Sequence, residues 1–266
     1  MKMMITDDTS EIHPSMTKLF LSLVDKDAIM LKGGNYSKAF ELLSNWGGGH
    51  DADAIEPTIY YKLLYQVLFK TFGDELGEKD FNSLSSGHLM ANTYPFIFND
   101  DESIWWDDIN SKEKETRADI INSAFNQSVV DIEKQLGSEI TKWNWYKGHQ
   151  LEHPHPLGMV KPLDKIFNVG PFGVKGGNQV INNIDFHFSK DGIYKATYGP
   201  AIRILLDFAD IENSISVLPT GESGNFMSKH YSDQTEMYNQ GTFRKQMMNR
   251  DEIVKTNIGI LVLSPK

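Results

Sequence analysis

Three histidines lie close together in the segment KGHQLEHPHPLG, residues 147–158, and could bind a metal ion. His149 and His153 are four residues apart, the spacing at which two side chains of one helix bind zinc. However, Glu152 does not stand where the two-histidine metalloprotease motif has its glutamate, and the prolines after His153 and His155 would break a helix. The sequence leaves two hypotheses open, a zinc site or a proline-rich packed loop, and favours the second.

No residue stands in a recognisable nucleophile motif. The chain has no cysteine, which excludes thiolate nucleophiles, disulfides and cysteine zinc sites. It also has no G-x-S-x-G elbow: Ser223 in TGESGN follows Gly221 by two residues, but the order of the residues after it is wrong for one. Composition and spacing alone therefore do not disclose an activity.

An arginine and an aspartate stand four residues apart in the apolar segment AIRILLDF, residues 201–208. A carboxylate at the end of an apolar strand normally needs a partner, and Arg203 is suitably spaced to pair with Asp207. The favoured interpretation is a buried ion pair at a strand end. The alternative is a pair of residues that supports a nearby site.

Two glycine-rich segments invite a ligand-binding interpretation. Residues 168–179, NVGPFGVKGGNQ, lack the Lys-Ser/Thr ending and the following helix of a phosphate-binding loop. The segment WGGGHDADA lacks the acid spacing of a calcium-binding EF-hand loop. We expect both segments to be structural, the first because glycines allow its backbone to approach other groups closely.

The first half of the sequence predicts amphipathic helices. Apolar residues recur at helical spacing in residues 15–24, before the glycines at 47–49, in residues 56–73 and in residues 110–137. We expect the last two helices to end at their final glycines, and Asn110 to cap the last one. The predicted buried stripes are Ile59, Leu63, Val67 and Lys70 in one helix and Ile121, Phe125, Val129, Ile132 and Leu136 in the other.

After about residue 140 short β-prone segments replace the helical pattern. A turn signal, SKDG at residues 189–192, predicts a hairpin. The sequence therefore predicts an α+β fold in one segment, residues 1–266, with about 1–140 mainly helical and about 141–266 strand-rich. The expected strands are 184–188, 192–199, 201–208, 214–219 and 258–263.

Bulk composition excludes several classes of protein. The net charge of −10 and the absence of a lysine- and arginine-rich run argue against nucleic acid as a partner. No apolar stretch is long enough to span a membrane. The first residues contain no signal peptide, so we expect either a cytosolic protein or a true N-terminus that lies elsewhere.

A series of motifs resembles the C-terminal part of the β subunit of penicillin acylases and acyl-homoserine-lactone acylases. YGPAIRILLDF is similar to the family's small-residue turn, arginine and aspartate-terminated strand. PTGESGN, residues 219–225, and SKHYSDQ, residues 228–234, resemble the loop and helix start that follow. WNWYKGHQLEHPHPLG, GPFGVKGGNQVIN and LLSNWGGG resemble upstream segments, although Gly47 replaces the family's usual aspartate. The resemblance covers nearly the whole chain.

This resemblance implies an N-terminal-nucleophile hydrolase with an αββα core, of which the chain would form the C-terminal portion. In such enzymes autocleavage makes a serine the first residue of the β subunit. Its α-amino group serves as general base, and an asparagine and a backbone N–H hold the oxyanion. The implied reaction is cleavage of the amide bond of N-acyl compounds, acylated β-lactams or acyl-homoserine lactones. The resemblance also implies a periplasmic or extracellular location and a role in antibiotic biosynthesis or quorum quenching.

The sequence departs from the family at the catalytic residues. No stretch resembles the Ser-Asn-x-Trp start of the β subunit, and the family's calcium ligands lie outside the matching segment. We therefore expect a fragment or subunit that is inactive alone, holds no cofactor, and needs the α subunit and the N-terminal part of β as partners. Strands without neighbours would favour self-association. The alternatives are a non-catalytic binding or scaffold protein and the histidine-loop metal hydrolase.

For the region around PTGESGN the resemblance implies supporting roles rather than catalysis. For Arg203 and Asp207 the resemblance implies that they orient residues of a nearby site without contacting the substrate themselves. We expect the two outer glycines of the loop to adopt backbone conformations closed to other residues, and a His-Tyr pair to pack the loop down. The residues assigned to this structural loop are Gly221, Ser223, Gly224, His230 and Tyr231.

Overall fold

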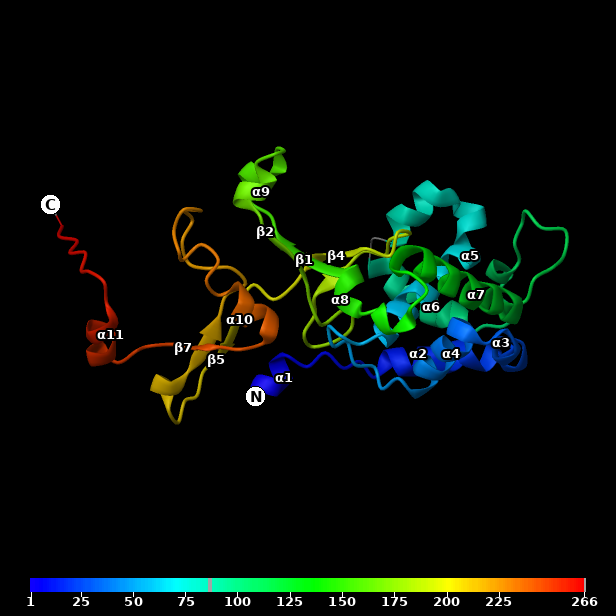
Figure 1. Cartoon of the computed structure of the whole chain (residues 1–266), viewed down its shortest axis with the longest axis horizontal. Helices are drawn as coiled ribbons and strands as arrows, with labels where there is room; N and C mark the ends of the chain where they lie inside the picture. The colour runs from blue at the N-terminus through cyan, green and yellow to red at the C-terminus, as the bar shows by residue number, and fades with distance from the viewer. Residues whose placement is uncertain (86–87, 266) are drawn as a thin grey trace. The chain divides into compact units, whose positions relative to one another are not determined.

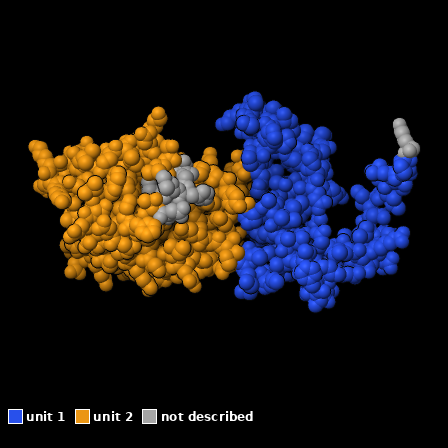
Figure 2. Space-filling model, turned by 180° about the vertical axis from the view of Figure 1, so that it is seen from behind, with its two compact units in different colours: residues 1–6, 153–169, 200–266 blue, residues 7–152, 170–199 orange. Residues whose placement is uncertain are grey.

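The protein folds into two compact units, traced in Figure 1 and coloured separately in Figure 2. The computed structural model describes residues 1–85 and 88–265, and their side chains except those of 88–92. Unit 1 comprises residues 1–6, 153–169 and 200–266, and unit 2 comprises residues 7–152 and 170–199. Within the described residues no helix is long and apolar enough to cross a membrane.

Unit 2 contains the predicted helical half of the chain. Its longest helices, α5 and α7, pack side by side and form the centre of the unit (Figure 1). The helices are α2 (Ile12–Leu23), α3 (Lys26–Lys32), α4 (Gly34–Asn45), α5 (Glu56–Ser85), α6 (His88–Phe98), α7 (Arg117–Leu136) and α8 (Trp145–Gly148).

The predicted apolar stripes form the core between these helices. Ile59, Leu63 and Val67 of α5 and Phe125 and Val129 of α7 are completely buried. Every residue from 57 to 68 is buried, including the polar Thr58, Lys62 and Gln66, so α5 is enclosed on all sides over these turns. The predictions of both helices and of their buried faces are confirmed, except that Lys70 and Leu136 at the ends of the two stripes are only partly buried.

Two predicted helix boundaries are wrong. Helix α5 does not stop at Gly73 but continues to Ser85, with a break at Gly77, where φ is +69°. The packing of later residues such as Phe81, which is fully buried, outweighs the cost of a glycine inside a helix, about 1 kcal/mol. Helix α7 is capped by Thr116 rather than Asn110, and it ends before Gly137 as predicted.

The strands of unit 2 form a small sheet in the order β2-β1-β4-β3. Strand β1 pairs in parallel with β4, with His149 opposite Tyr194, and β3 pairs antiparallel with β4. The hairpin predicted at residues 189–192 is confirmed, and Gly192 has φ of +70° in its turn. The strands are β1 (His149–His153), β2 (Val169–Gly173), β3 (Asp185–Phe186) and β4 (Tyr194–Tyr198).

Unit 1 contains an antiparallel sheet in the order β5-β6-β7, with Arg203 opposite Val217. Strand β5 is much shorter than the predicted 201–208. No described residue of the predicted strand 258–263 pairs with another strand, and this segment is extended and exposed. The elements are β5 (Arg203–Leu205), β6 (Ile215–Val217), β7 (Arg244–Lys245) and the helices α1 (Lys2–Ile5), α9 (Asp164–Phe167), α10 (Thr235–Gln240) and α11 (Arg250–Thr256).

Helices thus fill the first half of the chain, and every strand of the described residues lies between residues 149 and 245. The prediction of an α+β fold with a helical first half and a strand-bearing second half is confirmed.

Candidate functional site

Two buried histidines meet inside unit 2. His13 Nδ1 lies 3.2 Å from His50 Nε2, which also lies 3.1 Å from the Tyr61 hydroxyl oxygen. His50 Nδ1 faces the carbonyl oxygen of Gly48 at 2.8 Å. A ring nitrogen that faces a carbonyl carries the proton, so neutral His50 is protonated at Nδ1 and its Nε2 accepts a hydrogen bond. These contacts join the N-terminal segment of unit 2 to α5.

Both rings are neutral near pH 7. Burial and, to a smaller extent, the proximity of His50 together lower the pKa of His13 to about 3. Burial lowers the pKa of His50 to about 4, although the carbonyl oxygens of Asp8 and Gly48 oppose this shift. The pair is therefore a set of neutral hydrogen-bonding groups in the core.

The ring of His149 is fully buried and is held by backbone groups. Its Nδ1 lies 3.0 Å from the Val174 carbonyl oxygen and its Nε2 lies 2.9 Å from that of Ile184. Neither nitrogen is available to a metal ion. His155 Nδ1 accepts the Leu157 N–H at 3.1 Å. In the part of the chain that the structure describes, no three His, Cys, Asp or Glu residues are grouped to hold a metal.

The glycine-rich segment 168–179 brings its backbone close to other backbone groups. A Cβ atom at Gly173 would overlap the carbonyl oxygen of Tyr146, and one at Gly176 would overlap that of Asn182. The expectation of a structural loop whose glycines permit close approach is confirmed.

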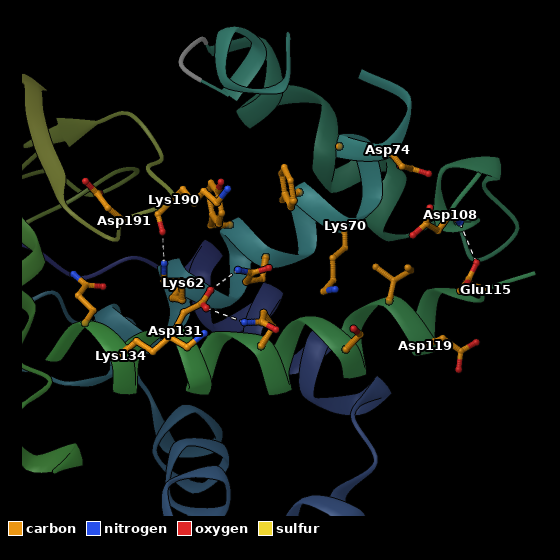
Figure 3. A pocket seen from close by; sticks show the side chains of 18 residues that line it. Lys62, Lys70, Asp74, Asp108, Glu115, Asp119, Asp131, Lys134, Lys190 and Asp191 are labelled. Atoms are coloured by element: carbon orange, nitrogen blue, oxygen red, sulfur yellow. Dashed lines mark hydrogen bonds between the residues drawn. The ribbon is translucent and has the colours of Figure 1, made fainter. Parts of the chain in front are cut away.

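A pocket of about 960 Å³ lies between α5 and α7 in unit 2 (Figure 3). This volume is in the range of small-molecule sites. Phe69 supplies an apolar wall, with the almost fully buried Tyr65 and Ile120 behind it. Charged side chains of both signs line the rest of the pocket: Lys62, Lys70, Lys134, Lys190, Asp74, Asp108, Glu115, Asp119, Asp131 and Asp191.

Arg203 is buried in unit 1, with only 5% of its surface exposed. Its Nη1 donates to the backbone carbonyl oxygen of Tyr238 at 2.5 Å, and its guanidinium carbon lies 3.9 Å from the centre of the Tyr238 ring. The Tyr238 hydroxyl donates to the Pro200 carbonyl oxygen at 2.7 Å. Arg203 therefore fastens β5 to α10 by a charged hydrogen bond and a cation–π contact.

Asp207 is exposed and does not form the expected ion pair with Arg203. One carboxylate oxygen accepts the Ala209 N–H at 3.0 Å, and its own N–H donates to the Ser214 hydroxyl at 3.2 Å. In a regular strand the side chains of Arg203 and Asp207 would lie on the same face of the sheet. Because β5 ends at Leu205, this alternation of side chains does not reach Asp207. Asp207 instead organises the turn that follows.

The PTGESGN loop is held by backbone hydrogen bonds. The Gln234 N–H donates to the Thr220 carbonyl oxygen at 2.9 Å, and the Ser223 N–H donates to that of His230 at 3.1 Å. A Cβ atom at Gly221 would overlap the His230 carbonyl oxygen, whereas Gly224 faces open space. Neither glycine has a positive φ, contrary to expectation. Gly221 is required for space, and Gly224 is not.

The two residues expected to pack this loop down behave differently. The Tyr231 hydroxyl donates to the Phe167 carbonyl oxygen at 2.5 Å and thereby ties the loop to the end of α9. His230 is exposed, and its Nδ1 lies 2.7 Å from an Asp233 carboxylate oxygen. Only Tyr231 anchors the loop.

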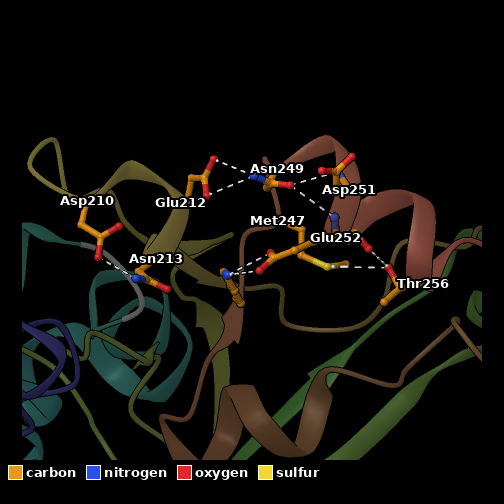
Figure 4. A network of polar contacts seen from close by, with 9 residues as sticks. Asp210, Glu212, Asn213, Met247, Asn249, Asp251, Glu252 and Thr256 are labelled. Carbon is orange, nitrogen blue, oxygen red and sulfur yellow. Dashed lines mark hydrogen bonds and ion pairs between the residues drawn. The ribbon is translucent and has the colours of Figure 1, made fainter.

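Polar contacts near the C-terminus also serve the fold (Figure 4). Asn249 caps α11 by accepting the Asp251 N–H at 2.9 Å, and its amide donates to Glu212 at 3.2 Å. Lys245 pairs with Glu252 at 2.9 Å. These exposed contacts hold α11 to neighbouring segments of unit 1.

The sequence analysis assigned no role to His13, His50 or the pocket. The two histidines are 37 residues apart, and only tertiary packing brings them together: α2 packs against α4, and the His13 ring lies against Tyr60 and Tyr61 of α5. Lys70 did carry a signal, because a lysine stood on an otherwise apolar stripe. The structure places it at the pocket rather than in the core.

Comparison with known proteins gives consistent matches. The family model for penicillin amidase matches residues 1–255. The acyl-homoserine lactone acylase QuiP of Pseudomonas syringae pv. syringae is 26% identical over 215 residues, which are 78% of this chain and 26% of that protein. QuiP of Pseudomonas aeruginosa is 25% identical over 236 residues, 81% of this chain and 28% of that protein.

Among solved structures, a thermostable penicillin G acylase from Alcaligenes faecalis aligns with a TM-score of 0.46 and 12% identity, over 98% of this chain and 48% of that one. The chain spans about a quarter of the length of the curated relatives named above. Because the family model covers nearly all of its residues, the chain belongs to the penicillin amidase family.

Proposed function

We propose that this chain forms the C-terminal part of a penicillin-amidase-type hydrolase that cleaves the amide bond of N-acyl compounds, with the nucleophilic serine outside the chain. The observation that carries this proposal is the family match over residues 1–255. Acyl-homoserine lactones are the preferred substrate class over acylated β-lactams, because the curated relatives are named acyl-homoserine lactone acylases.

The role of the chain in this proposal is to complete the fold. The family-like residues of unit 1 bind backbone groups, as Arg203 does at Tyr238 and Tyr231 does at Phe167. Such contacts support a structural task. The proposed partner is the remainder of the acylase, the α subunit and the N-terminal part of β, which would also carry the family's calcium ligands. A periplasmic or extracellular location belongs to the same proposal.

Amide hydrolysis by the purified chain, alone and produced together with the remainder of its acylase, tests this function. The substrates are an N-acyl-homoserine lactone and penicillin G, and released amine is measured. We expect no release above buffer from the chain alone and release of homoserine lactone from the combination. Hydrolysis by the chain alone would contradict an external nucleophile. An inactive combination would contradict the acylase function and leave a non-catalytic scaffold.

A further inference from the structure

Lys70 presents an unpaired positive charge to the pocket between α5 and α7. The side chain is half-buried, and Figure 3 shows it directed from α5 across the pocket toward α7. No hydrogen bond or ion pair joins Lys70 to any residue that the structure describes. A charge that is partly withdrawn from water interacts more strongly with a counter-charge than an exposed one does. Lys70 is therefore suited to bind an anionic group of a ligand.

The other lysines of the pocket are less suited to this task. The Lys62 ammonium donates to the carbonyl oxygen of Lys190 at 2.8 Å, and Lys190 pairs with Glu78 at 3.1 Å. Lys134 is exposed to solvent. Anion binding in the pocket thus depends on Lys70.

The carboxylate of Asp131, near Lys62, already accepts hydrogen bonds from two glutamine side chains. The two oxygens of Asp131 accept from the amides of Gln66 at 2.5 Å and Gln127 at 2.8 Å. These amides hold the Asp131 carboxylate in place, and its remaining negative charge adds to the repulsion of ligands with two or more negative charges.

Acidic residues limit how much negative charge the pocket can accept. Asp74 follows Lys70 by one helical turn, but it accepts the Ile109 N–H at 2.8 Å instead of pairing with the lysine. Asp108, Glu115 and Asp119 lie at the same end of the pocket (Figure 3). Their repulsion disfavours ligands with two or more negative charges, such as phosphate esters.

The residues beside Lys70 determine what uncharged group a ligand can carry next to its anionic group. Phe69 on α5 is partly exposed and offers aromatic surface, whereas Tyr65 and Ile120 behind it are almost fully buried. We propose that this pocket binds a small monocarboxylate with an apolar or aromatic body, the carboxylate on Lys70 and the body against Phe69. All of these residues belong to unit 2, so the proposal does not depend on the acylase function.

Calorimetric titration of the full chain with 3-phenylpropanoate tests this site. We expect saturable binding, loss of binding for the neutral analogue 3-phenylpropanamide, and weaker binding of the dianion phenyl phosphate. The substitution K70M should weaken binding by at least about tenfold, as expected for a lost hydrogen bond to a charged group. K70R should retain most of the affinity because it keeps the charge.

Matched variants separate this site from unspecific attraction. K134M removes an exposed pocket lysine, and K38M removes an exposed lysine of α4 outside the pocket. Both should bind 3-phenylpropanoate as the unaltered chain does, and tryptophan fluorescence should confirm that all variants are folded. The proposal is overturned by absent saturation, by equal binding of the amide, by tighter binding of phenyl phosphate, or by equal weakening in K134M or K38M.

Discussion

Arg203 links β5 to α10 through a hydrogen bond to the Tyr238 backbone and a contact with its ring. We expect R203A to destabilise unit 1 by about 2–3 kcal/mol, because a hydrogen bond from a charged group is worth about 1.5–3 kcal/mol and a desolvated cation–π contact adds to it. D207A should change stability by less than about 0.5 kcal/mol, because Asp207 is exposed. Amide hydrogen exchange of β5 and β6 measures both effects. Equal losses in the two variants would restore the ion-pair interpretation.

The buried histidines make the stability of unit 2 depend on pH. Burial lowers the pKa of His13 to about 3 and of His50 and His149 to about 4, against an unfolded value near 6.5. Between these values the unfolded chain binds protons that the folded chain does not, so stability falls as pH decreases below 6.5. From pH 7 to pH 5 we expect a loss of roughly 2 kcal/mol for each histidine.

Denaturant unfolding followed by tryptophan fluorescence checks this prediction, because all five tryptophans belong to unit 2. The variant H50Q should reduce the pH dependence, whereas H230A, which alters an exposed histidine of unit 1, should leave it unchanged. A flat profile between pH 7 and pH 5 would show that the three rings do not titrate in this way.

Among the helices, α7 offers a test of its N-terminal cap: the structure has Thr116 as the cap, whereas the sequence predicted Asn110. The Thr116 hydroxyl accepts the Asp119 N–H at 3.3 Å, and the Asp119 carboxylate accepts the Thr116 N–H at 2.9 Å. We expect T116A to destabilise unit 2 by about 1 kcal/mol and N110A to have no measurable effect. Fluorescence-detected unfolding compares them directly. A larger loss for N110A would mean that the helix starts earlier in solution.

The PTGESGN loop gives a second test at this scale. G221A would force a methyl group onto the His230 carbonyl oxygen, so the two loop segments must separate. We expect the exchange of the Ser223 and Gln234 amide protons, which bond across this loop, to become at least about tenfold faster, equivalent to about 1.4 kcal/mol. G224A faces open space and should exchange as the unaltered chain does. Similar protection in both variants would contradict the close approach.

The helices were predictable from the sequence because their signals are local. The buried faces of α5 and α7 and the end of α7 at Gly137 follow from apolar spacing and from one glycine. Strand extents depend on partners far away in the chain. The segment 201–208 is apolar enough for a long strand, yet only Arg203–Leu205 find a neighbour in β6.

The candidate sites were less predictable than the fold. His13, His50 and Tyr61 meet only through tertiary packing, and no spacing in the sequence records that contact. The pocket requires the relative placement of α5 and α7, which periodicity alone does not give. The family-like motifs, in contrast, were readable in the sequence, because their residue order is local to one loop and one helix start.

At the scale of the whole molecule, the segment 258–263 exposes a continuous apolar surface. Ile258, Ile260, Leu261, Val262 and Leu263 are each at least 77% exposed. An unpaired β-prone segment of this kind pairs readily with other chains. We expect the isolated chain to self-associate, and the double variant I260K/V262K to shift it toward the monomer in sedimentation velocity. A monodisperse unaltered chain at the same concentrations would contradict this expectation.

We propose that this member of the penicillin amidase family completes the fold of an acylase whose catalytic serine lies outside residues 1–266. The most direct measurement is the DNA sequence upstream of the Met1 codon in the source genome. We expect a reading frame, continuous or in a neighbouring gene, that encodes a serine followed by the Asn and Trp of a β-subunit start. A stop codon and ribosome-binding site immediately before Met1, with no such gene nearby, would contradict it and identify a free-standing scaffold.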